Sequence, residues 1–290
     1  MSKSPNIKIF VAHHKPWLIY EDDIFVPIHV WKKNSKYDLW ILWDDTWDNI
    51  SSKNYLYAEL TAQYRVWKNY DMSDTDYIWL CHYRRYYTYY YKHTIKDIFN
   101  TKNIHSFFGK MFHILGSILF FWRTAIQKKF EDMDFKSNSK SIDEFIRNNH
   151  RDVYLYKRVP INGWWAGIYP LKHLQIRQKF FREICKNALL QLYPEYKDAL
   201  EKVQKKHLFN WCNMFIMKKE LFIEYSQWLF NYFDLLEEKV KENNVDLLKE
   251  REEPRFYWYF SECLLNLFIE YKKMTGHISV SYDANILMLS

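Results

Sequence analysis

The run His82-Tyr83-Arg84-Arg85 has the clearest chemical potential, because it directly follows the apolar stretch Tyr77–Cys81. A short apolar stretch of this kind is typical of a buried strand. Two adjacent guanidinium groups offer planar donor forks that pair with phosphate oxygens. In open α/β sheets, ligands bind at the carboxyl ends of the strands. This position favours a diphosphate-binding role for the two arginines over an ordinary basic pair on the surface.

Further polar side chains lie after the first apolar run, Ile7–Ala12, and before the first expected helix. His13 and His14 follow that run, and adjacent side chains in an extended segment point to opposite faces, which argues against one shared metal ion. A second group could bind sugar hydroxyls, or could equally be turn and cap residues. It consists of Asp44, Asp45, Asp48, Asn49 and Ser51.

Two carboxylate features leave alternatives open. Asp74-Thr75-Asp76 has the spacing of a metal-binding DxD motif, but it precedes its strand, so we interpret it as a turn. Glu262 follows a strongly aromatic stretch, and such surroundings can raise the pKa of a carboxyl group and suit it to general-base work. An acidic residue favoured by the dipole of the first helical turn explains Glu262 slightly better from these residues alone.

Hydrophobic periodicity predicts strands and helices in alternation, which is typical of an α/β fold. The expected strands are 7–12, 25–30, 77–81, 153–160 and 213–217, and the expected helices are 53–69, 173–192, 195–207, 219–241 and 260–272.

Composition narrows the classes of protein that fit. With 48% hydrophobic and 20% aromatic residues, the 290-residue chain can bury a large core, which excludes disorder. The net charge of +7 favours anionic partners, but no nucleic-acid-binding motif is present, so we expect no nucleic acid partner. Four scattered cysteines indicate a reducing compartment, and the polar start of the chain does not have the pattern of a signal peptide. We therefore expect a cytoplasmic protein.

The longest apolar run, Phe107–Trp122, is interrupted by Lys110 and His113 and is too short to cross a bilayer. Basic residues follow it, so it fits either a peripheral contact with the inner face of the plasma membrane or a buried core segment.

Several blocks of sequence, in order, resemble the DUF4422 family. They are KIFVAHHKP at 8–16, PIHV at 27–30, DNISSKNYLYAELTAQYRVWKN at 48–69, DYIWLCHYRRYY at 76–87, NMFIMKKELFIEYSQWLF at 213–230 and FSECLL at 260–265. That family is associated with bacterial capsular polysaccharide and lipopolysaccharide assembly and is grouped with GT-A glycosyltransferases.

The resemblance implies a GT-A-like, Rossmann-type fold with a mixed central sheet flanked by helices and a helical C-terminal part. We expect a single domain over 1–290, with a nucleotide-sugar-binding part at 1–90. This part is followed by a variable insertion at 91–152 and by an acceptor-side, helical part at 153–290. The implied activity is an inverting, hexosyltransferase-type transfer from a nucleotide sugar, with a UDP-sugar expected, to a lipid-linked or oligosaccharide acceptor. The alternative is a non-catalytic glycan-binding protein.

The resemblance also implies roles for individual residues. Glu262 becomes the expected general base and Asn213 an acceptor-side residue, while Cys263 stands where the family motif has arginine. Because no DxD motif is well placed, we assign no metal ligand. We expect the charge of the arginines to replace, wholly or partly, the Mn²⁺ or Mg²⁺ that would stabilise the leaving diphosphate. The expected donor-binding residues are His13, His14, Asp48, Asn49, Lys53, Asn54, His82, Tyr83, Arg84 and Arg85.

Tryptophan and glycine usage is unusual. The chain has 5 glycines, against roughly 20 expected for this length, and 13 tryptophans. Six tryptophans stand where the family pattern has glycine, which predicts UGA codons that the source organism decodes as glycine. They are Trp31, Trp40, Trp43, Trp47, Trp79 and Trp258. The rival interpretation is that they are true tryptophans on which sugars stack.

Overall fold

The computed structural model describes residues 5–92, 126–156, 159–160, 179–206, 208–210, 213–247 and 255–290. The expected membrane-contacting run, Phe107–Trp122, lies outside these residues. Within them, no helix has a stretch long and apolar enough to cross a bilayer.

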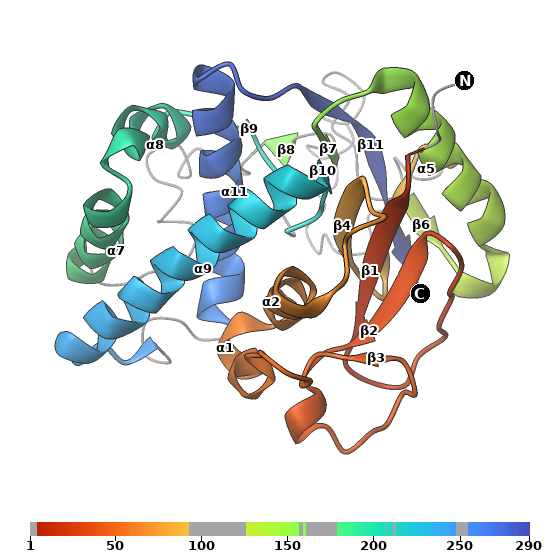
Figure 1. Cartoon of the computed structure of the whole chain (residues 1–290), viewed down its shortest axis with the longest axis horizontal. Coiled ribbons are helices and arrows are strands. Elements are labelled where there is room, and N and C mark those ends of the chain that lie inside the picture. The colour runs from red at the N-terminus through yellow and green to blue at the C-terminus, as the bar shows by residue number, and fades with distance from the viewer. Residues whose placement is uncertain are drawn as a thin grey trace, which may run out of the picture.

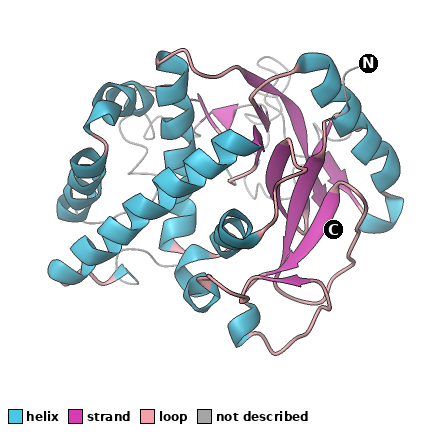
Figure 2. Ribbon diagram, viewed as in Figure 1, coloured by secondary structure: helices cyan, strands magenta, loops and turns pink. Residues whose placement is uncertain are grey.

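The described residues form a nine-stranded mixed sheet with the order β10-β7-β11-β5-β4-β1-β2-β3, in which β6 also pairs with β11 and β10 with β4 (Figure 2). Strands β1 to β4 pair in parallel with one another, whereas β10 and β5 run antiparallel to β4. The strands are β1 (Ile7–His13), β2 (Phe25–His29), β3 (Leu42–Trp43), β4 (Tyr77–His82), β5 (Arg85–Thr88), β6 (Ile126–Lys128), β7 (Val153–Tyr156), β10 (Phe215–Lys218) and β11 (Val280–Leu289). A separate pair consists of β8 (Val159–Pro160) and β9 (Leu208–Phe209).

Helices cover both faces of the sheet (Figure 1). On one face, α5 packs Phe135 and Ile142 against Ile9 of β1, while Phe10 of the same strand faces the other helices. This alternation follows from the two-residue period of a strand, and it explains why β1 has apolar residues on both faces. The helices are α1 (Asn54–Tyr57), α2 (Leu60–Asn69), α5 (Phe135–Asn149), α7 (Lys179–Leu192), α8 (Lys197–Gln204), α9 (Lys219–Glu242) and α11 (Phe256–Met274).

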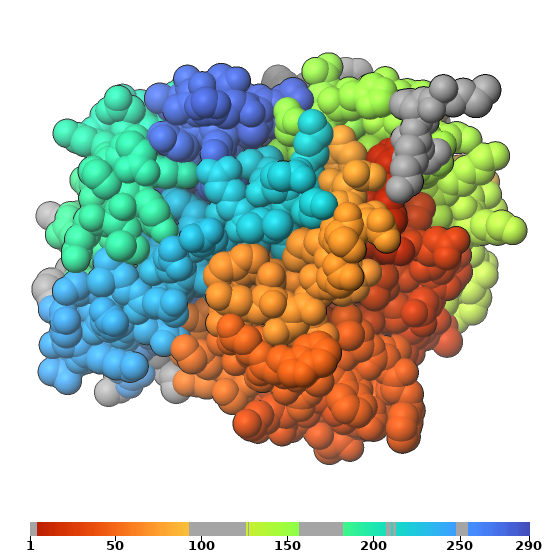
Figure 3. All heavy atoms as spheres, in the orientation of Figure 1, coloured from red at the N-terminus to blue at the C-terminus, as the bar shows by residue number. Residues whose placement is uncertain are grey.

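Aromatic stacking joins the helical layer to the first part of the chain. The rings of Trp67 on α2 and Phe230 on α9 stack with centroids 5.7 Å apart, and Tyr57 on α1 stacks on Tyr257 of α11 at 4.5 Å. Figure 3 shows α9 lying directly against α2 on this face. Such ring pairs add about 0.5–1.5 kcal/mol each to the area that they bury.

The structure confirms a mixed α/β fold with a sheet flanked by helices, and among its differences from the sequence expectations three bear on the site. The helix expected over 53–69 is broken at Ala58, whose φ of 46° and ψ of −127° separate α1 from α2. The last helix begins at Phe256, four residues earlier than expected. The chain then returns to the sheet as β11, a strand that the sequence pattern did not predict.

Three of the six suspect tryptophans have left-handed backbone. Trp31, Trp40 and Trp47 have φ values of 62°, 53° and 52°. That region is costly for residues with a Cβ and open to glycine, so it favours glycine at these three positions. The other three tryptophans lie in β3, β4 and α11, where the backbone has no such preference for glycine.

Candidate functional site

The carboxyl ends of the parallel strands β1, β2, β3 and β4 meet at one edge of the sheet, called here the carboxyl edge. His13 and His14 lie there at the end of β1, and His82 ends β4, where it is level with Ala12 of β1. The chain proceeds from β1 to β2 on one side, and β4 pairs with β1 on the other. Such a reversal of strand order opens a crevice at the carboxyl ends, where α/β proteins bind ligands.

Tyr83 is the centre of this edge. It lies with Arg84 in the two-residue turn of the β4–β5 hairpin, which His82 and Arg85 close as a pair. Its side chain is 5% exposed, and its ring contacts those of His13, His14 and Trp17 at centroid distances of 5.8, 5.2 and 5.8 Å. The ammonium of Lys15 and the guanidinium of Arg84 lie 5.9 and 5.2 Å from its centroid. A buried ring thus supports two exposed cations.

The two histidines after β1 differ in their surroundings. His13 is fully buried, and neither ring nitrogen has a hydrogen-bond partner in the described part of the chain. Burial, followed by the nearby His14 and His29, lowers the pKa of His13 to about 4, so its ring is neutral at pH 7. Burial also lowers the pKa of His14; Lys15, Arg84 and Arg255 lower it further, and Glu59 opposes them. The charges of three cations therefore act on His14.

Sequence analysis missed Glu59 and Arg255. The break at Ala58 places Glu59 between α1 and α2, with its Oε1 2.8 Å from Nδ1 of His82. Arg255 precedes α11, and its backbone N–H donates to the carbonyl of Tyr55. A continuous helical pattern over 53–69 hid the first residue, and nothing in the local sequence around Arg255 indicates that α11 begins against α1.

The predicted donor-binding residues between β3 and α2 all have partners within the chain. Asp48 accepts from the Tyr64 hydroxyl at 3.0 Å, and Asn49 donates to the carbonyl of Trp47 at 2.8 Å. The ammonium of Lys53 lies 2.8 Å from Glu237 of α9. These contacts hold the loop after β3, and a role in donor binding stays a prediction.

Asn54 and Asp44 stabilise the backbone around this loop. The Asn54 amide donates to the Ala58 carbonyl at 2.7 Å and to the Thr61 hydroxyl, and so bridges the break between α1 and α2. The fully buried Asp44 carboxylate accepts from the backbone of Trp31 and from the hydroxyls of Ser51 and Thr61. Both residues thereby help to place Glu59.

The predicted general base and acceptor-side residue meet at the start of α11. The Asn213 amide donates to the carbonyl of Trp258 at 2.8 Å and to the Ser261 hydroxyl. The Trp258 ring stands edge-on to that of His82, with centroids 5.7 Å apart. Glu262 is 5% exposed and lies one helical turn after Trp258. The first two turns of α11 thus connect Glu262 and Asn213 with His82, although their roles stay predictions.

A divalent metal ion would need several oxygen or nitrogen ligands from neighbouring side chains. Among the described residues, no group of three or more His, Cys, Asp or Glu side chains is arranged to hold a metal ion. Asp76 of the DxD-like turn accepts from the backbone N–H of Asn6 at 2.7 Å, at the amino end of β4 and thus at the opposite edge of the sheet. The described residues of the carboxyl edge do not fit a divalent cation.

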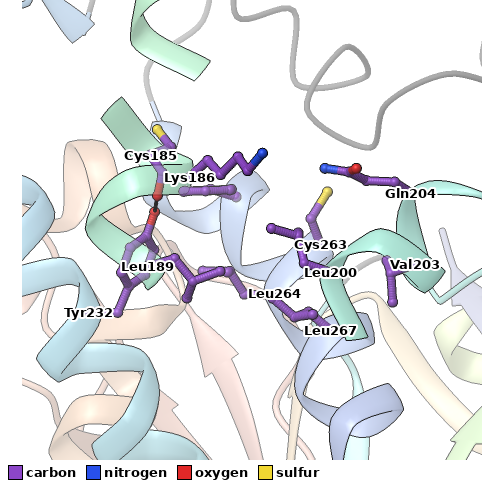
Figure 4. Close-up of a pocket in the computed structure, with 11 residues that line it drawn as sticks. Cys185, Lys186, Leu189, Leu200, Val203, Gln204, Tyr232, Cys263, Leu264 and Leu267 are labelled. Atoms are coloured by element: carbon purple, nitrogen blue, oxygen red, sulfur yellow. Dashed lines mark hydrogen bonds between the residues drawn. The ribbon is translucent and has the colours of Figure 1, made fainter. Parts of the chain in front are cut away.

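An apolar pocket lies between α7, α8 and α11 (Figure 4). Leu189, Leu200 and Leu264 line it, and the side chains of Cys185 and Cys263 border it. A diphosphate requires several charged or N–H donors, whereas Lys186 and Gln204 are the polar side chains with such donors among the described, largely apolar residues of this lining. We therefore place the candidate site at the carboxyl edge.

Comparisons with known proteins agree with the α/β fold of this chain. The apo structure of the bifunctional glycosyltransferase WbbM superposes with a TM-score of 0.76 and 27% identity over 98% of this chain. The match covers 45% of the WbbM chain, so this chain spans less than half of that protein's length. No curated protein sequence matches. Residues 8–159 and 171–273 match the model of a domain of unknown function, DUF4422. The chain therefore belongs to the DUF4422 family.

Proposed function

We propose that this chain is a glycosyltransferase with a GT-A-like site, and that it binds a nucleotide-sugar donor at the carboxyl edge. One observation carries the proposal: the exposed cations of Lys15 and Arg84 flank the buried ring of Tyr83, and neither forms an ion pair within the described residues. Arg255, whose charge acts on both His14 and Glu59, adds to the positive potential there. Exposed cations attract an anionic ligand, and guanidinium forks fit phosphate oxygens. The likeness to WbbM, a bifunctional glycosyltransferase, supports a donor with a diphosphate.

In this proposal, the diphosphate of a UDP-sugar lies against Arg84 and Arg255. Glu262 accepts the proton of the acceptor hydroxyl, whose oxygen forms a bond to the anomeric carbon. The bond from that carbon to the phosphate oxygen breaks, and its electron pair leaves on the diphosphate. A single displacement of this kind inverts the anomeric centre. The cations stabilise the charge that develops on the leaving group.

The direct test is the release of UDP from a panel of UDP-sugars, preceded by thermal-shift measurements that identify which sugar stabilises the fold. We expect slow hydrolysis of one donor and faster release when an acceptor glycan is added. A glycan-binding protein without activity would release no UDP. Transfer that EDTA abolishes and Mn²⁺ restores would contradict the assignment of the diphosphate to protein cations.

A charge variant tests the location of the donor site. Arg84→Ala removes a charged hydrogen-bond donor, so we expect UDP affinity to fall about tenfold to a hundredfold. Arg147→Ala is the matched control, because Arg147 pairs with Asp143 near the end of α5, where the following Arg151 carbonyl accepts from Tyr77 at the amino end of β4. Equal effects of the two variants on UDP binding in calorimetry would place the donor elsewhere.

A further inference from the structure

Glu59 and His82 are in direct contact at the carboxyl edge. Oε1 of Glu59 lies 2.8 Å from Nδ1 of His82, and the His82 residue is 8% exposed. The other ring nitrogen of His82, Nε2, has no hydrogen-bond partner within the described residues. Because the two nitrogens lie on opposite sides of the ring, Nε2 faces away from Glu59.

Glu59 is ionised in these surroundings. Burial alone would raise the pKa of its carboxyl group, but the attraction and hydrogen bond of His82, together with the charge of Arg255, lower it to about 2. A carboxylate that accepts from Nδ1 holds a proton on that nitrogen and stabilises positive charge on the ring. When the ring is charged, Nε2 also carries a proton and becomes a donor.

The groups around this pair indicate what Nε2 meets. His14 follows β1, Arg84 lies in the β4–β5 turn, and Arg255 precedes α11. The ring of Trp258 covers one side of His82. The charge of Arg255 acts on Glu59, and Arg84 follows His82 by two residues, so a free donor at Nε2 is suited to an anion.

We propose that Glu59 is a positioning residue that holds His82 as an imidazolium, with its Nε2–H donated to the diphosphate of the donor. This inference rests on the proposed function and assigns His82 to the leaving group rather than to the acceptor. His82 keeps its proton throughout: it donates a hydrogen bond to a phosphate oxygen while the bond from that diphosphate to the anomeric carbon breaks. The pair contributes positive charge where other enzymes use a metal ion.

The experiment measures UDP binding by calorimetry between pH 5.5 and 8.5 for the wild type, Glu59→Gln and His82→Gln. The protein used is the full chain. In the wild type, we expect the charged ring of His82 to contribute part of the affinity for UDP, and this part is lost when His82 loses its proton. Without the carboxylate, we expect that loss at a pH lower by about one unit or more, so Glu59→Gln binds UDP about tenfold more weakly at pH 7.5 and normally at pH 5.5. His82→Gln, whose amide is neutral, loses this component at every pH.

Comparison with a control separates positioning from a general effect on the fold. Glu270→Gln removes a buried carboxylate on the same helix as Trp258, and we expect it to retain the wild-type pH profile. All four proteins titrate the same UDP, so the ligand's own ionisation cancels in the comparison. A purely structural role of Glu59 would weaken binding by the same factor at all pH values, which would overturn the proposal.

A second measurement needs no ligand. The ring of His82, identified in NMR spectra by its absence from His82→Gln, should lose its proton at lower pH in Glu59→Gln than in the wild type. An unchanged titration of this ring overturns the inference even if UDP binds. A weakening of UDP binding confined to low pH would also overturn it, because His82 would then act as a base. If the ring titration shifts as expected but the wild type binds no UDP, the proposed function fails instead.

Discussion

Two carboxylates with different surroundings mark the difference between the carboxyl edge and the helical layer. Glu270 on α11 is 4% exposed. One of its oxygens lies 2.9 Å from the ammonium of Lys202 on α8, and the other pairs with Lys206, which follows that helix. Glu59 has one oxygen bonded to His82, while its buried Oε2 has no hydrogen-bond partner in the described residues. Both oxygens of Glu270 therefore have partners within the chain, whereas one oxygen of Glu59 has none among the described residues.

The difference concerns these two carboxylates, because buried polar atoms without partners, such as Trp228 Nε1 and Tyr257 Oη, also occur in the described helical layer. A buried polar atom without a partner costs about 1–3 kcal/mol, which a ligand can offset. The carboxyl edge has several such atoms, namely Oε2 of Glu59 and both ring nitrogens of His13. Helix α11 connects the two regions, since it begins beside His82 and reaches Glu270 two turns after Glu262. Variants along this one helix can therefore test the comparison.

The largest effect is expected at the first of these positions. Glu262→Gln removes the proposed base but keeps the size of the side chain, so we expect kcat to fall by about 10²- to 10⁴-fold while the fold is retained. Single-turnover transfer from the donor identified by thermal shift measures it, and circular dichroism checks the fold. Transfer at the wild-type rate would remove Glu262 from this role.

A smaller effect, on stability alone, is expected at the far end of the helix. Glu270→Gln leaves Lys202 and Lys206 unpaired; because Lys202 is more than half exposed and can turn to water, we expect a loss of about 2 kcal/mol in the free energy of unfolding. Urea unfolding measures this loss, and transfer by the folded variant should be unchanged. A loss of transfer comparable with that of Glu262→Gln would break the division between the two regions.

The pH dependence of that stability has a defined sign. Burial would raise the pKa of Glu270, but the hydrogen bonds and charges of the two lysines lower it below the ordinary value of 4.5. The pair therefore stabilises the fold above about pH 4.5, where the carboxyl group of the unfolded chain is also ionised. This contribution is lost as the pH falls through the lower folded pKa. The wild type should lose stability over this acidic range, and Glu270→Gln should lose less.

The smallest effects concern the tryptophans beside the carboxyl edge. Trp40 and Trp47 are 85% and 77% exposed and have positive φ, so glycine at either position should raise the free energy of unfolding by about 1 kcal/mol. Trp43→Gly, in strand β3, is the control, and we expect it to destabilise by about 0.5–1 kcal/mol. Urea unfolding of the three variants measures the difference.

The gene sequence provides an independent check of the same point. UGA codons at positions 31, 40 and 47 would agree with glycine at these positions, whereas UGG would show true tryptophans. If glycine at 40 and 47 also proves destabilising, the exposed indoles are native side chains, and sugar stacking becomes the better explanation of them.

Much of the sheet could be predicted because its strands carry their own pattern. Apolar runs mark β1, β4 and β10, and the position of Arg84 just after β4 is enough to place it at the carboxyl edge. Strand β11 has a mixed burial pattern, alternating only loosely, and its partners β5 and β7 are remote in the chain. No local period could therefore indicate it.

The sequence by itself determined the alternation of strands and helices, the family, and the cationic turn after β4, because each depends on neighbouring residues. Only the tertiary structure decided that Glu59 pairs with His82, because that contact requires the break at Ala58. Only the tertiary structure decided that α11 begins beside the same histidine, through packing between residues 176 positions apart, His82 and Trp258. Such contacts depend on how whole elements pack together, and no short stretch of the chain encodes them.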